Sequence, residues 1–63
     1  MNTTSLMSIE DVAAYLQVPK ASVYKWRHTG SGPLGIRVGK YVRYRRSDVD
    51  SWLDRQARRE EGK

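Results

Sequence analysis

The 63-residue sequence predicts a mostly helical fold with one small β-hairpin, in the order helix, helix, hairpin, helix. Three observations predict this fold. Apolar residues recur at spacings of three and four in two segments that meet at Pro19, and again after Ser47. Between residues 36 and 45 the apolar positions instead alternate with arginines, which is the period of a β-strand. A loop with three glycines separates the first two helices from this hairpin.

A first helix is expected over residues 9–16. Ser8 can accept hydrogen bonds from the amides of the opening turn, and Glu10 and Asp11 complement the positive end of the helix. Met7, just before this cap, is expected to pack against the apolar stripe of the helix. That stripe, which should face the core, consists of Ile9, Val12, Ala13 and Leu16.

Pro19 ends the first helix and opens a second one, because proline lacks an amide donor yet suits the first turn of a helix. The second helix is expected over residues 19–28 and should end before Gly30, a good left-handed cap residue. Val23 and Trp26 are three residues apart and should point inward. The outward residues are Lys20, Ala21, Tyr24, Lys25 and His28.

Residues 36–38 and 42–45 are expected to form two short strands. Gly39 and Lys40 between them suit a two-residue turn that opens with glycine. The alternation predicts that one face of the hairpin is apolar and that the other is a row of arginines. The apolar face would hold Ile36, Val38, Val42 and Tyr44, and the basic face would hold Arg37, Arg43 and Arg45.

A third helix is expected to begin at Ser47, with Asp48 and Asp50 in its first turn. A serine followed three residues later by an acid is the pattern of an N-terminal cap. Beyond Arg55 the apolar pattern weakens; charge pairs could prolong the helix there, but it cannot bury much and we expect fraying. The buried stripe of this helix would be Val49, Trp52 and Leu53.

The composition indicates one small intracellular domain. The chain is too short to enclose a large active site, and it has no Cys for a disulfide or a thiolate metal site, which fits a reducing cytoplasm. No apolar run approaches bilayer length, and the first residues lack the features of a secretory signal. The expected organisation is an N-terminal arm over residues 1–7, a domain over 8–55 and a charged C-terminal tail over 56–63, in a cytoplasmic protein.

The charges are strongly polarised along the chain. Between Val12 and Ser47 the sequence has eight basic residues and no Asp or Glu, whereas all seven acids lie outside that segment. A scattered excess of charge would serve solubility alone, but this clustering is typical of a face that binds a polyanion such as a nucleic-acid backbone. The eight residues are Lys20, Lys25, Arg27, Arg37, Lys40, Arg43, Arg45 and Arg46.

The apolar spacing across the first two helices fits a helix-turn-helix. Two short helices cross steeply in this motif, so the first needs a small residue at the crossing, and Ala13 suits that position. The same spacing would also suit a plain three-helix core. The acid-free outward face of the second helix favours the first interpretation, because a helix that enters a DNA major groove needs such a face. The apolar anchors are Leu16, Val18, Val23 and Trp26.

Five segments are characteristic in their content and order, namely residues 8–18, 22–27, 38–40, 42–45 and 47–53. Together they resemble the excisionase-family winged helix-turn-helix domain, a relative of the MerR-type DNA-binding domain. The Ser-Asp-Val-Asp-Ser-Trp-Leu run after the arginine-rich wing is the most distinctive part, and the resemblance covers residues 6–55. It implies a phage or integrative-element excisionase, a recombination directionality factor that binds and bends attachment-site DNA and helps an integrase to excise the element.

Two positions depart from the family pattern. Pro19 stands where relatives often have Ser or Thr, so a hydroxyl that could contact a phosphate is missing. The backbone amides at that helix end are left to make the contact. Gln17 occupies a turn position where glycine is common, which affects the geometry of the turn rather than the function.

We expect contacts with duplex DNA from the second helix, taken as the recognition helix, and from the hairpin, taken as the wing. Lys20 and Lys25 could contact guanine edges or phosphates, and phosphate contact is the default for an unknown target. The wing arginines could enter the minor groove or lie along phosphates. The expected contact residues are Lys20, Ala21, Ser22, Tyr24, Lys25, Arg27 and His28 in the helix, and Arg37, Lys40, Tyr41, Arg43 and Arg45 in the wing.

No group of residues points to catalysis, and we expect no enzyme, no cofactor and no metal site. His28 is the only histidine, and Trp26 and Trp52 are expected in the core rather than on a stacking platform for single strands. The same domain also serves small transcriptional regulators, so that role is the main alternative. The expected partners are duplex DNA, an integrase and further copies of the chain on DNA, with no membrane and no small-molecule substrate.

Overall fold

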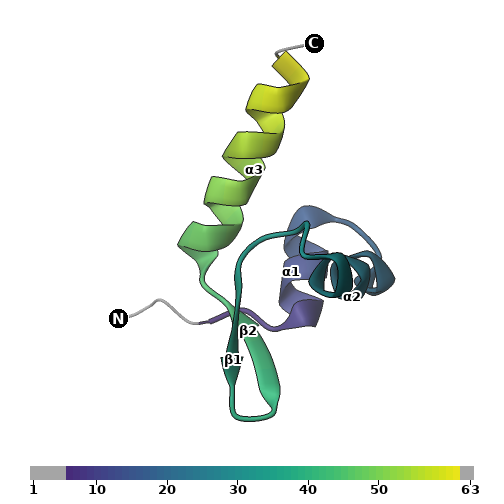
Figure 1. Cartoon of the computed structure of the whole chain (residues 1–63), viewed down its shortest axis with the longest axis vertical. Helices are drawn as coiled ribbons and strands as arrows, with labels where there is room; N and C mark the ends of the chain where they lie inside the picture. The colour runs from purple at the N-terminus through teal and green to yellow at the C-terminus, as the bar shows by residue number, and fades with distance from the viewer. Residues whose placement is uncertain (1–5, 62–63) are drawn as a thin grey trace.

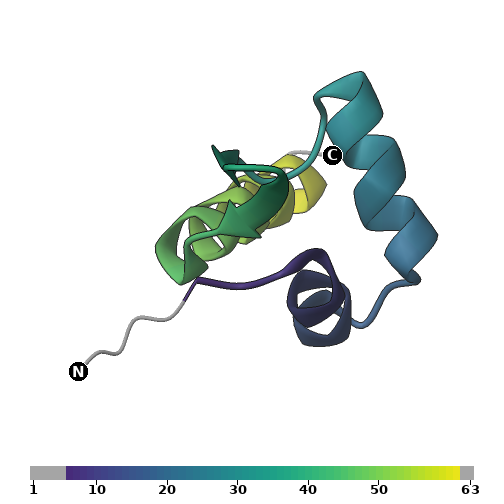
Figure 2. The ribbon, with the colours of Figure 1, turned by 90° about the horizontal axis from the view of Figure 1, so that it is seen from below.

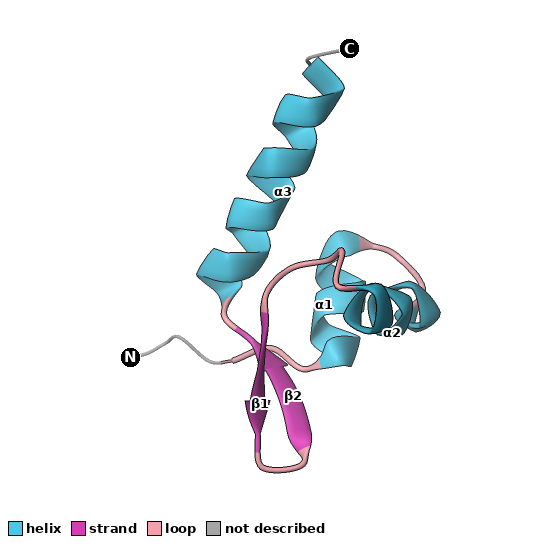
Figure 3. Ribbon diagram, in the orientation of Figure 1, coloured by secondary structure: helices cyan, strands magenta, loops and turns pink. Residues whose placement is uncertain are grey.

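The computed structural model describes residues 6–61, so the parts of the expected arm and tail that fall on residues 1–5 and 62–63 lie outside the described residues. The fold class is confirmed: three helices and a two-stranded antiparallel hairpin follow one another in the expected order (Figure 1, Figure 3). No helix in the described part of the chain is long and apolar enough to cross a membrane. The elements are α1 (Ile9–Leu16), α2 (Lys20–Thr29), β1 (Gly35–Val38), β2 (Tyr41–Tyr44) and α3 (Arg46–Glu61).

α1 begins after Ser8, as expected. The Ser8 hydroxyl accepts a hydrogen bond from the Asp11 amide at 3.0 Å, and the Asp11 carboxylate accepts one from the Ser8 amide at 3.0 Å, which completes a capping box. At the other end, Gln17 has a left-handed φ of 58°. Because a side chain disfavours this conformation by about 1 kcal/mol, the packing of the two helices rather than Gln17 itself must hold the turn.

α2 is displaced by one residue from the expected span. Pro19 is its N-cap rather than its first helical residue, and no side chain caps this end. Thr29, expected in the loop, is the last helical residue, and its hydroxyl donates to the Lys25 carbonyl at 3.1 Å. Gly30 then ends the helix in the left-handed conformation, with φ of 76°.

The hydrophobic core lies where α1, α2, β2 and the start of α3 meet. Ala13 is buried, as the crossing of two motif helices requires. Tyr44 is the largest fully buried side chain, with 1% of its surface exposed, and its main chain pairs with Met7 as an isolated antiparallel bridge. The buried residues of the core cluster are Ile9, Val12, Ala13, Val23, Tyr44 and Val49, and Met7, Leu16, Val18, Trp26 and Val42 pack around them.

The contacts that anchor α3 come from its first turns. Trp52 lies against Trp26, with ring centroids 5.0 Å apart, and its indole nitrogen donates to the Ser31 carbonyl at 3.2 Å. The Tyr15 hydroxyl of α1 donates to the Asp50 carboxylate at 2.6 Å. Both tryptophans are half-buried. From these contacts α3 extends away from the hairpin turn, and its C-terminal end lies at the opposite end of the molecule (Figure 1). In the view from below, the hairpin and α3 overlap, and α1 and α2 lie to one side of them (Figure 2).

The expected cap of α3 is wrong. The helix begins at Arg46, and the Arg45 carbonyl accepts the amides of its first turn. Ser47 therefore lies inside that turn rather than before it. Asp50 lies beyond the first turn and pairs instead with Arg46, one helical turn earlier, at 3.7 Å.

The expected burial of Leu53 is also wrong. Leu53 is 37% exposed, whereas Val49 is fully buried and Trp52 is half-buried. The core reaches only the side of α3 that carries Val49 and Trp52. The helix also continues through Glu61, so the segment expected as a tail over residues 56–63 begins as helix.

The pairing of the hairpin corrects the expected faces. Residues directly opposite each other in an antiparallel pair project from the same face. Gly39, with φ of 61°, and Lys40 form a two-residue turn, which sets even-numbered residues of one strand opposite odd-numbered residues of the other. The expected apolar face and row of arginines therefore do not exist. One face carries Gly35, Arg37, Val42 and Tyr44, and the other carries Ile36, Val38, Tyr41 and Arg43.

We predict that Gly32→Ala destabilises the fold. A Cβ at Gly32 would lie 2.6 Å from the Cβ of Trp26 and 3.0 Å from its ring, and a Cβ so close to its own main chain cannot move aside. The expected loss is about 1–3 kcal/mol of unfolding free energy, measured by urea denaturation. Gly30→Ala is the matched control, because a Cβ there meets nothing within 4 Å and only the left-handed backbone is strained. Equal losses in the two variants would contradict the packing argument.

Candidate nucleic-acid interface

α2 presents an exposed face that contains no acid. Its first turn follows Pro19, and no side chain caps that turn. The Ser22 amide donates to the Pro19 carbonyl at 2.9 Å, so a ligand at this end would meet the amides that precede Ser22. Two basic residues stand in its last turn, which suits the negative end of the helix. Of the expected contact residues in α2, Lys20, Ala21, Tyr24, Lys25, Arg27 and His28 are exposed and Ser22 is half-buried.

The guanidinium of Arg27 lies against the hairpin. A Cβ at Gly35 would lie 2.8 Å from Arg27 Nη1 and 3.2 Å from the ring of Tyr44. Burial raises the pKa of the Tyr44 hydroxyl, and the nearby Arg27 guanidinium lowers it in part. Arg27 thus joins α2 to the base of the wing.

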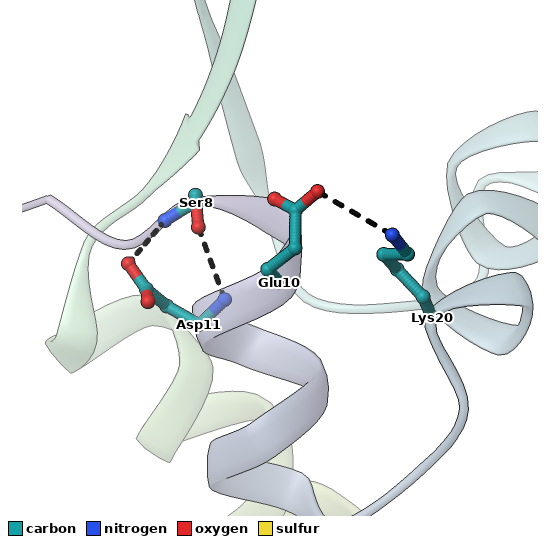
Figure 4. A network of polar contacts seen from close by, with 4 residues as sticks. All are labelled: Ser8, Glu10, Asp11 and Lys20. Atoms are coloured by element: carbon teal, nitrogen blue, oxygen red, sulfur yellow. Dashed lines mark hydrogen bonds and ion pairs between the residues drawn. The ribbon is translucent and has the colours of Figure 1, made fainter.

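Lys20 lies close to the start of α1. Its ammonium is 3.7 Å from the Glu10 carboxylate, and both side chains are more than half exposed (Figure 4). An exposed pair of this kind contributes at most about 1 kcal/mol. The pair therefore orients Lys20 without preventing it from contacting a phosphate.

The cap of α1 lies beside this pair (Figure 4). The Ser8 main-chain amide, followed by the Ser8 hydroxyl, holds the pKa of Asp11 below its ordinary value of 3.8, and Arg43 of the wing adds a smaller effect in the same direction. A bond to the charged form of an acid always lowers its pKa. Asp11 therefore stays ionised to more acidic pH in the folded chain than in the unfolded one.

We predict a pH dependence of stability from this carboxylate. Because its pKa is lowered by folding, its contribution is complete above pH 3.8 and is lost as the pH falls through the lower folded pKa. Asp11→Asn should remove this part of the acid dependence in urea denaturation. Ser8→Ala should keep most of it, because the Ser8 amide remains. An unchanged acid dependence in Asp11→Asn would disprove the assignment.

The wing carries cations on both faces and at its turn. Arg37 and Arg43 lie on opposite faces, and Lys40 lies in the turn. Tyr41 is 55% exposed, with Arg43 Cζ 5.1 Å and Lys40 Nζ 5.9 Å from its ring centroid. Arg45 lies at the base of the wing, where its carbonyl starts α3. The expected wing residues therefore separate into a group near the turn and Arg45 alone.

An open groove of about 420 Å³ lies between α1, α2 and the wing. It brings Tyr24 of α2 together with three expected wing residues. It also includes Glu10, which the sequence alone indicates only as a residue of the helix start. The contact of α1 with the other two elements is tertiary, so no local pattern signals it. The groove is lined by Ser8, Ile9, Glu10, Tyr24, Lys40, Tyr41, Val42 and Arg43.

Comparison with known families matches residues 6–57 to the model of a helix-turn-helix domain. The matched range includes α1, α2 and the hairpin in full, and α3 as far as residue 57. Comparisons with curated proteins and with solved structures give no match.

Proposed function

Because this chain belongs to the helix-turn-helix domain family and is a DNA-binding protein, we propose that it is an excisionase. In this role it binds and bends attachment-site DNA, in several copies, and directs an integrase towards excision. The resemblance of residues 8–53 to excisionases supports the proposal. The mechanism is architectural and non-catalytic.

The observation that carries the proposed binding mode is the acid-free, exposed face of α2 next to a wing with cations on both faces. We place α2 in a major groove, where Tyr24 and Lys25 reach base edges or phosphates, and the wing in the adjacent minor groove. Arg37 and Arg43 then face the two walls of that groove. A wing that contacts both walls favours one particular width of the minor groove. Because a change in minor-groove width accompanies DNA bending, this supports bending as part of the function.

A gel-shift titration on the attachment-site DNA of the encoding element tests the proposal, in parallel with the promoter of the neighbouring genes. Circularly permuted attachment-site fragments report bending. Cooperative, bent complexes at the attachment site are expected. Tight, unbent binding confined to the promoter would instead make the protein a transcriptional regulator. Equal, weak binding to every duplex would remove the claim of sequence selectivity.

A further inference from the structure

β2 has an open edge beside the groove. Tyr44 directs its amide and carbonyl away from β1, because both bond to Met7, at 2.8 and 2.7 Å. Residues two apart on an antiparallel strand direct these groups to the same side. Val42 therefore directs its own amide and carbonyl to the edge where Met7 lies. The chain leaves that edge after Ser8 to form α1, so no strand within residues 6–61 covers Val42.

The two main-chain groups of Val42 differ in their partners. The carbonyl accepts a hydrogen bond from Arg43 Nη1 at 2.8 Å. The amide is directed to the edge of Met7, and the residues that follow Met7, namely Ser8, Ile9 and Glu10, line the same groove as Val42. A main-chain amide is an obligatory donor, and its bond to a charged oxygen is roughly twice as strong as its bond to a neutral one.

The charges around this amide favour an anion. Lys40 and Arg43 supply two cations on the wing side, and the Tyr24 hydroxyl supplies a neutral donor from α2. Glu10 is the acid among the groove residues, and Lys20 at 3.7 Å offsets its charge. The groove therefore suits an oxyanion of low charge. A nucleic-acid strand that passes between α2 and the wing would carry such a group.

We propose that this groove binds one phosphodiester group of DNA, with the Val42 amide as a main-chain donor beside Lys40, Arg43 and Tyr24. The inference rests on the proposed placement of α2 in the major groove and the wing in the minor groove, because the backbone between these grooves then crosses this site. Such a contact carries no base information. It fixes the position of the wing along the duplex.

The test uses chemically synthesised full-length chain in which an ester replaces the amide of Val42, which removes one N–H without changing a side chain or a charge. The matched control has an ester at Arg37, the cross-strand partner, whose amide points to the opposite edge of the hairpin. Binding to a short random-sequence duplex is measured by fluorescence anisotropy. The Val42 ester should weaken binding about tenfold with an unchanged salt dependence, and the Arg37 ester should bind like the parent chain. Equal losses, or no loss at Val42, would overturn the site.

A second measurement does not depend on the folding of the ester chain. Lys40→Ala should lower the salt slope by about one, whereas Tyr24→Phe should leave it unchanged. Because both groups would contact the same phosphate, their effects on affinity should be non-additive in a double-mutant cycle. Additive losses would overturn the shared site. The assay contains neither attachment site nor integrase, so a failure of the excisionase proposal leaves its result intact, whereas a parent chain that does not bind the duplex overturns both.

Discussion

Tyr44→Ala is expected to destabilise the domain by about 3–5 kcal/mol, in the range seen when a large core side chain is truncated. Tyr44 is 1% exposed and lies between the hairpin, the Met7 bridge and the core. A domain of this size has about 3–9 kcal/mol of stability in total, so much of the variant should be unfolded. Urea denaturation followed by tryptophan fluorescence measures the loss, because Trp26 and Trp52 are packed together in the native state.

Tyr44→Phe is the control for this prediction. It keeps the buried ring and removes only the hydroxyl that Arg27 contacts. A loss of about 1 kcal/mol or less is expected. If Tyr44→Ala were as mild as Tyr44→Phe, the ring would not be the centre of the core.

Lys25→Ala combined with Arg43→Ala is expected to weaken duplex DNA binding by about 100-fold or more, since each contact is worth about 1–3 kcal/mol. Lys25 is exposed on α2, and Arg43 is half-buried on the wing, where it donates to the neighbouring carbonyl of Val42 and stacks on Tyr41. Neither side chain belongs to the core, so the melting temperature should change little. Anisotropy titration at fixed salt measures the affinity.

The matched control for charge is Arg58→Ala combined with Arg59→Ala. These arginines lie in the last turn of α3, at the end of the molecule opposite the hairpin turn (Figure 1). The control removes the same two charges and should lose far less affinity. Equal losses in the two double variants would show that binding depends on net charge rather than on the α2 and wing face.

The first two helices could be predicted from the sequence because their ends have local chemical causes. The Ser8 hydroxyl accepts from the Asp11 amide, and the Gly30 amide donates to the Trp26 carbonyl. Both bonds stay within about one turn, so they do not depend on the rest of the fold. The start of α3 could not be predicted in this way. Ser47 has the residue type of a cap, but the helix begins only two residues after the end of β2. The Arg45 carbonyl therefore accepts the first helical hydrogen bonds, from the amides of Asp48 and Val49.

The faces of the hairpin required two facts to be combined. The alternation along each strand was correct, and the two-residue turn at Gly39 and Lys40 is also present. Together they set Arg37 opposite Val42 and Ile36 opposite Arg43, which alternation alone does not reveal. The pattern along one strand does not show which residues of its partner share a face with it.

The candidate interface divides in the same manner. The exposed side of α2 follows from helical periodicity around Val23, so its basic residues could be predicted. The neighbourhood of Glu10 and Lys20, and the contact of Arg27 with Tyr44, depend on how separate elements pack. No local pattern carries that information.

In the hairpin, the residues that fix the fold differ from the residues that are free to contact DNA. A slip of one residue would expel Tyr44 from the core, so burial of Tyr44 and packing of Val42 fix the pairing. Residues 37–41 extend beyond the core and are all exposed. Substitutions in that segment can therefore change which DNA the wing prefers at little cost in stability. A new preference for DNA sequence can therefore evolve in residues 37–41, while selection for folding acts on Val42 and Tyr44.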